Sequence, residues 1–121
     1  MKFLCLAYGS ETDWSELSKA EQDMLLAQDE LLRQRGALMG AVKTEVTTVR
    51  AWSGVPEAAN QPFAKLEAPL AGFSIIEADT LADAVKLVAN TPCARAKGAI
   101  EIRPILILNA EEWKATNQQD R

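Results

Sequence analysis

The stretch Ala71-Gly72-Phe73-Ser74-Ile75-Ile76-Glu77, preceded by the turn-like tetrapeptide Asn60-Gln61-Pro62-Phe63, decides the fold that this sequence predicts. We expect residues 72–78 to form a strand, because β-branched and aromatic side chains favour an extended backbone. Asp79-Thr80 follows directly and is typical of a helix start. The apolar stripe of that helix consists of Leu81, Ala84, Val85 and Val88. The segment Asn90-Thr91-Pro92 ends the helix, so a strand and a helix follow each other directly.

A second helix is predicted nearer the N-terminus. Ser18 and Glu21 have the spacing of a capping box, in which each residue satisfies a free backbone N–H of the other. The helix is expected over residues 18–35, with Gly36 as the residue that closes it. Its expected apolar stripe consists of Ala20, Met24, Ala27 and Leu31, with Leu25 and Leu32 beside it.

The segments around this helix complete the first half of the chain. Residues 2–8 carry apolar side chains on both faces, which predicts a strand covered on both sides. Residues 9–17 are predicted to form a polar loop that carries Trp14. Residues 37–52 are rich in β-branched side chains and are expected to be extended. Residues 53–70 hold three of the five prolines, so we expect a loop or an irregular hairpin there.

The C-terminal part is predicted to contain the last strand. Residues 93–98 are expected to form a short basic turn, and residues 99–108 a strand. Pro104 cannot donate a backbone hydrogen bond, so this strand should lie at an edge of the sheet. Residues 109–121 are expected to form a tail or a short helix bearing Trp113.

The order of elements predicts the architecture. Strand–helix–strand, a loop, and again strand–helix–strand is the ferredoxin-like βαββαβ arrangement of the α+β class, with an antiparallel sheet and both helices on one face. We expect one domain over residues 1–108. The uncovered face of such a sheet still carries apolar side chains, so a homodimer that packs these faces together is predicted. Alternatively, residues 53–70 and the tail cover the face.

Composition excludes several classes of protein. The formal net charge is −4 and basic residues are dispersed, which argues against nucleic-acid binding. Apolar runs stay well short of the ~20 residues that cross a membrane. Cys5 and Cys93 have no metal or disulfide spacing and indicate free thiols in a reducing compartment, hence the cytoplasm. The chain has no histidine, which excludes catalytic Ser–His or Cys–His pairs and His-based metal sites. We therefore expect no metal and no cofactor.

The chain resembles the YCII-related proteins, and more closely their DGPF-like branch. The segments that carry this resemblance are residues 3–9, Trp14, the helix closed by Gly36, Pro62-Phe63, Leu70, Gly72-Phe73, Ile76-Glu77-Ala78, the helix around 82–89, Pro92 and Glu101-Ile102-Arg103-Pro104. The resemblance implies a dimeric α+β barrel with a cleft for a small molecule in each subunit. It also implies an Asp and a His in that cleft as the suspected acid–base pair.

The sequence departs from this family pattern where chemistry is expected. The Asp-Gly-Pro-Phe of the branch is Asn60-Gln61-Pro62-Phe63 here, and an amide is no base near neutral pH. The histidine of the wider family has no counterpart. We therefore interpret the chain as a small-molecule-binding dimer without this pair. An enzyme of the dimeric α+β barrel type that works without His and a purely structural or interaction subunit are the alternatives, and catalytic residues stay unassigned.

Six residues are the candidates for ligand binding. Four aromatic residues are interpreted as walls of an apolar pocket: Tyr8, Trp14, Trp52 and Phe63. Asn60 supplies an amide from its turn, and Arg103 a polar group at the pocket rim beside Glu101. Each also has an ordinary structural interpretation, namely aromatic core packing, turn geometry and a solvated edge strand.

Two further groups are candidates for a reactive or an anion-binding site. Cys93 lies close to basic residues, which lower the pKa of a thiol, but an incidental cysteine is the simpler interpretation. Arg95 and Lys97 suit an anion, but a solvated basic turn explains them equally. The carboxylates of Asp29 and Glu67 have no partner that the sequence reveals.

Overall fold

A computed structural model describes residues 1–109 of the chain. Its elements are β1 (Lys2–Tyr8), α1 (Glu11–Ser15), α2 (Lys19–Gln34), β2 (Leu38–Ala41), β3 (Thr48–Arg50), β4 (Glu57–Ala59), β5 (Leu70–Glu77), α3 (Leu81–Val88), α4 (Pro92–Arg95) and β6 (Ala99–Pro104). The predicted tail or short helix lies outside the described residues apart from Asn109.

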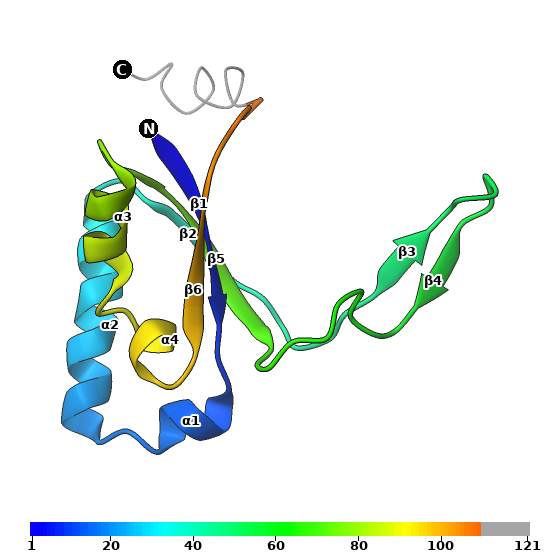
Figure 1. The fold of residues 1–121 in the computed structure, drawn as a ribbon. Coiled ribbons are helices and arrows are strands. Elements are labelled where there is room, and N and C mark those ends of the chain that lie inside the picture. Colours follow the sequence, from blue (N-terminus) through cyan, green and yellow to red (C-terminus); the bar gives the residue numbers. More distant parts are fainter. Residues whose placement is uncertain (110–121) are drawn as a thin grey trace.

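The main sheet confirms the predicted architecture. Its strand order is β2-β5-β1-β6, and all neighbouring strands are antiparallel. α2, α3 and α4 lie on one side of this sheet (Figure 1). This is the ferredoxin-like α+β arrangement. β6 is an edge strand that ends at Pro104, as the missing N–H of proline requires, although it is four residues shorter than the predicted strand.

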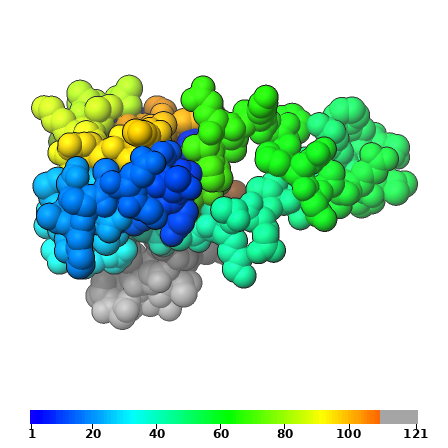
Figure 2. All heavy atoms as spheres, turned by 90° about the horizontal axis from the view of Figure 1, so that it is seen from below, coloured from blue at the N-terminus to red at the C-terminus, as the bar shows by residue number. Residues whose placement is uncertain are grey.

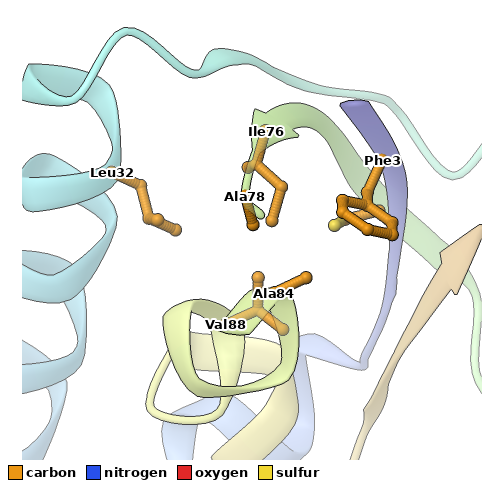
Figure 3. Packing of buried hydrophobic residues seen from close by; sticks show 7 residues of the cluster. Phe3, Leu32, Ile76, Ala78, Ala84 and Val88 are labelled. Carbon is orange, nitrogen blue, oxygen red and sulfur yellow. The ribbon is translucent and has the colours of Figure 1, made fainter. Parts of the chain in front are cut away.

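The hydrophobic core fills one end of the space between the sheet and the helices. Phe3 and Ile76 project from the two central strands toward Ala84 and Val88 of α3 and Leu32 of α2 (Figure 3). Phe3 is completely buried. Burial of such side chains stabilises a domain by about 1.5–3 kcal/mol each, so this end holds the layers together.

Helix α2 begins as predicted but buries a different stripe. The Ser18 side chain accepts a hydrogen bond from the Glu21 N–H, and the Glu21 carboxylate accepts one from the Ser18 N–H. The predicted stripe was wrong, because Met24 and Leu31 are 50% and 52% exposed. Leu25 and Leu32, seven residues apart, face the sheet instead. The helix has two apolar stripes, and packing against the sheet selects the second.

Two segments that were predicted as loops contain short helices. α1 lies within the expected loop 9–17, and the Ser10 side chain caps it by accepting the Asp13 N–H at 3.1 Å. α4 lies at the start of the expected turn 93–98 and begins with Pro92, a residue that suits the first helical turn. Both helices are too short for a recognisable apolar period, which is why the sequence pattern missed them.

The expected extended segment 37–52 is divided between two sheets. β2 joins the main sheet, whereas β3 pairs only with β4 in a separate two-stranded ribbon. The segment 53–70 thus supplies the second strand of a hairpin. This hairpin projects away from the body of the protein on the side opposite the helices (Figure 1), and Figure 2 shows it as a separate lobe. We call residues 43–68 the arm.

The second face of the main sheet is not covered by the helices (Figure 1), as the predicted arrangement with both helices on one face requires. This open face carries apolar side chains from three strands: Leu4, Leu6, Leu38, Phe73 and Ile75. Leu38 and Phe73 are exposed, and the other three are half-buried. Within residues 1–109, no helix is long and apolar enough to cross a membrane.

Candidate functional site

The side chains that face the helices become smaller along the two central strands. On β1 they change from Phe3 to Cys5 to Ala7. On β5 they change, in the same direction across the sheet, from Ile76 to Gly72. The large residues fill one end of the space between the layers. The small residues cannot fill the other end, so the sequence leaves a cavity there.

This space, which we call the interior cavity, opens to the surface of the protein and has a volume of about 180 Å³. Residues of the sheet, of α2 and of the α3–α4 region surround it. They are Cys5, Ala7, Asp29, Leu32, Met39, Gly40, Ala41, Ala71, Gly72, Phe73, Ser74, Val88, Thr91, Pro92, Cys93 and Ile100. The walls are mostly apolar, with a few polar groups among them, which is the usual composition of a small-molecule site.

Asp29 is the ionisable carboxyl group of this lining. It belongs to α2 and lies on the helix face of Leu25 and Leu32, four residues after one and three before the other. Burial raises the pKa of Asp29, and the nearby Arg33 guanidinium offsets part of that effect. A carboxyl group that is partly dehydrated in an apolar cavity binds hydrogen-bond donors and cations more strongly than one in water.

Two thiols line the same cavity. Burial raises the pKa of Cys93, and the Asp29 carboxylate raises it further. Burial also raises the pKa of Cys5, while a hydrogen bond with Ser74 opposes that shift. The idea that basic neighbours activate Cys93 is therefore wrong, because the dominant influences are burial and a negative charge. Both cysteines are free, and both thiols are protonated near neutral pH.

The hydroxyl groups of the cavity are partly engaged within the protein. Thr91 donates a 2.6 Å hydrogen bond from its Oγ1 to the carbonyl oxygen of Val88. This bond satisfies a carbonyl group at the C-terminal end of α3, and it engages the only hydrogen that the Thr91 hydroxyl can donate. Asp29 is consequently the strongest hydrogen-bond acceptor in the lining, and Cys93 and Cys5 are neutral, polarisable neighbours.

Tyr8 and Arg103 lie together elsewhere, on the open side of the sheet. The Tyr8 hydroxyl donates a 3.0 Å hydrogen bond to Glu101 Oε1, and Arg103 Nη2 lies 3.5 Å from the same oxygen. Desolvation raises the pKa of Tyr8, the hydrogen bond and charge of Glu101 raise it further, and Arg103 lowers it. Tyr8 and Glu101 line a groove with Lys97 of about 330 Å³.

Three other candidate residues belong to the arm. The guanidinium carbon of Arg50 lies 5.2 Å from the ring centre of Trp52 and 5.3 Å from that of Phe63. Asn60 Oδ1 accepts a 3.3 Å hydrogen bond from Thr47 Oγ1 across the hairpin. Asn60 therefore supports the geometry of the arm, as the turn interpretation requires.

The remaining candidate, Trp14, is half-buried in α1, and its carbonyl oxygen accepts a 2.9 Å hydrogen bond from Gln22 Nε2. The six candidate residues thus occupy three places, and none belongs to the lining of the interior cavity. The basic turn considered for anions is engaged as well. Arg95 bonds to Asn90 at 2.8 Å, and Lys97 Nζ lies 3.7 Å from Glu16 Oε2.

The residues of the cavity were largely missed, although one signal was present. Asp29 interrupts the apolar face between Leu25 and Leu32, and a carboxyl group on a buried helix face is an unusual and informative feature. The sequence gives no sign that Cys93 and Asp29 are neighbours, because Asp29 lies 64 positions earlier in the chain. In the part of the chain that the structure describes, no group of three or more Cys, Asp or Glu side chains is arranged to hold a metal ion.

Comparisons with known proteins point to one family. A family model described as YCII-related domain matches residues 1–114. Among solved structures, the chain is similar to 5-chloro-2-hydroxyhydroquinone dehydrochlorinase (TftG) from Burkholderia phenoliruptrix AC1100, in complex with 2,5-dihydroxybenzoquinone. The TM-score is 0.50 at 18% sequence identity, over 87% of this chain and 93% of that one. At this identity the likeness shows the fold. Among curated proteins, nothing matches the chain.

Proposed function

This chain belongs to the YCII-related family, and from that membership we propose that it is a small-molecule-binding homodimer whose ligand occupies the interior cavity. The observation that carries the proposal is the cavity itself, with apolar walls and the single carboxyl group of Asp29. A chain that served only as a structural subunit would have no reason to leave this space unfilled, because an unfilled cavity lowers the stability of a core.

The size of the cavity limits the ligand. Pockets for drug-sized molecules measure roughly 300–1,000 Å³, whereas this one measures about 180 Å³. A ligand of about one ring fits such a space. We infer a largely apolar ring with a hydroxyl or amino group that donates a hydrogen bond to Asp29. The protein in the similar solved structure holds 2,5-dihydroxybenzoquinone, so small hydroxylated rings are the first compounds to test.

Asp29 also supports a second candidate function, an enzyme that acts on a small metabolite without histidine. Its pKa is raised by burial, and a carboxyl group with a raised pKa is better matched to proton transfer near neutral pH than an ordinary one. The chain has no histidine to form the acid–base pair suspected in the wider family. We therefore rank binding above catalysis.

The open face supports the homodimer. Leu38 is 44% exposed and Phe73 36% exposed, and both lie on the sheet face opposite the helices. Burial of apolar surface stabilises by about 25 cal/mol per Å², and a two-fold pair is the commonest way to achieve it. We propose that the chain belongs to the DGPF-like branch, on the resemblance carried by Pro62-Phe63 and Glu101-Ile102-Arg103-Pro104. Two free thiols favour the cytoplasm.

Thermal unfolding with a panel of single-ring phenols, hydroquinones and aromatic amines tests the ligand site. A compound at 100 times its Kd stabilises the folded state by about 2.7 kcal/mol. We expect Ala7→Leu, which fills the cavity, to abolish the shift, and Asp29→Asn to reduce it. Asp23→Asn, on the exposed side of the same helix, is the matched control.

Binding that survives both cavity variants would contradict the proposed site, and so would a panel in which no compound shifts the melting temperature. Mass spectrometry of each binding compound after prolonged incubation separates the two functions. An unchanged compound supports binding alone. A product that Asp29→Asn no longer forms would establish the enzyme instead.

A further inference from the structure

The arm is a separate hairpin that carries several exposed apolar side chains. β3 pairs only with β4, and the hairpin stands apart from the body (Figures 1 and 2). Its exposed apolar side chains include Val49, Trp52, Val55 and Phe63, which are 63%, 88%, 65% and 75% exposed. An isolated two-stranded hairpin is marginally stable in water. Exposed apolar surface on such a hairpin marks a site of interaction.

The arrangement of this surface favours a planar apolar contact. The Arg50 guanidinium lies close to the rings of both Trp52 and Phe63, which holds the two aromatic residues on one part of the arm. The arm has no excess of charge. Its basic residues Lys43, Arg50 and Lys65 are balanced by an equal number of acidic residues, Glu45, Glu57 and Glu67. A strongly charged partner such as nucleic acid is therefore not favoured.

The direction of the arm favours a second copy of this chain as its binding partner. The arm leaves the sheet on the side of the open face, away from the helices (Figure 1). When two copies stack their open faces around a two-fold axis, each arm extends past the shared interface and along the other copy. In a two-fold dimer of identical chains, each chain carries both of the surfaces that contact each other. The arm and the open face meet this requirement, because both belong to this chain.

We propose that the arm of each copy packs on the partner subunit and buries Trp52 and Phe63 there. Two contacts then hold the dimer together: the packing of the two open faces, and the exchange of arms between the subunits. This inference rests on the proposed homodimer and goes beyond it. It assigns the arm a role in assembly and makes its aromatic residues determinants of dimer affinity.

Sedimentation velocity over a range of concentrations tests the inference. We expect the wild-type protein to dimerise and the double variant Trp52→Ser, Phe63→Ser to have a dimer Kd at least tenfold higher. Met24→Ser is the matched control, because Met24 is an exposed apolar residue on the helix side of the protein. It should leave Kd unchanged. All substituted residues are exposed, so circular dichroism should show an unchanged fold.

The outcomes separate this inference from the proposed dimer. A wild-type protein that stays monomeric at every concentration contradicts both. A dimer whose Kd is unaffected by the double variant contradicts the arm exchange and leaves the dimer intact. Acrylamide quenching of the Trp52 emission, obtained by subtracting the Trp52→Phe spectrum, gives a second measurement. Protection that rises with concentration supports exchange, whereas protection that is independent of concentration shows that the arm folds back on its own chain.

Discussion

Asp29 of α2 and Cys93 of α4 line the same cavity, and the carboxylate of Asp29 raises the pKa of the Cys93 thiol. Burial acts in the same direction and is the larger cause. This relationship keeps the thiol protonated near neutral pH. The ionisation of the Cys93 thiol therefore depends on the charge of Asp29.

The reactivity of Cys93 should respond to Asp29. Asp29→Asn removes the negative charge, so the pKa of Cys93 should fall and its thiolate fraction should rise. We expect iodoacetamide to alkylate Cys93 faster in this variant than in the wild-type protein between about pH 7 and pH 9. This range spans the ordinary thiol pKa of about 8.5. Mass spectrometry of the Cys93 peptide measures the rate. An equal or lower rate would show that the two side chains do not interact.

The stability of the protein should depend on pH through Asp29. Its folded pKa is raised by burial, so the folded state holds the proton more tightly than the unfolded chain does. Stability is therefore lost as the pH rises from the unfolded value of about 3.9 through the raised folded pKa. Asp29→Asn avoids this loss. The melting temperature of the variant relative to that of the wild type should therefore be higher at about pH 7 than at about pH 3.

The hydroxyl of Tyr8 should titrate according to its neighbours. The chain has one tyrosine, so the absorbance of tyrosinate reports this residue alone. Glu101→Gln removes the charge that raises the pKa of Tyr8, and Arg103→Gln removes the charge that lowers it. We expect the first variant to titrate at lower pH than wild type and the second at higher pH. Shifts in the opposite directions would contradict the observed cluster.

The two ends of the space between the layers should tolerate different substitutions. Phe3 is completely buried, and Phe3→Ala should lower the free energy of unfolding by about 3–5 kcal/mol. Ser74 faces the cavity, where added volume meets empty space. Ser74→Val should change the free energy by less than about 1.5 kcal/mol, as volume changes that avoid overpacking do. Urea denaturation measures both, and a larger loss for Ser74→Val would show that the cavity is not empty space.

The order of elements and several of their ends were accessible from the sequence. Ser18 and Glu21 identify the start of α2, Thr80 caps α3, and Pro104 marks an edge strand. Each signal acts between residues a few positions apart. The candidate site was less accessible. Tyr8 and Arg103 do lie together, but Asp29 and Cys93 meet only because α2 and α4 pack on the same sheet.

The sequence by itself determined the local structure, because caps, turns and apolar periods are set by neighbouring residues. It also determined that the side chains on one face of β1 become smaller from Phe3 to Ala7, although the cavity that results cannot be seen in the sequence. Tertiary structure alone decided which stripe of α2 is buried and that residues 43–68 leave the sheet as an arm. It also decided that the small residues of β1 and β5 lie side by side on the helix-facing side of the sheet and line one cavity. These outcomes depend on strand register and on packing between distant segments, and a single residue's neighbours along the chain do not encode them.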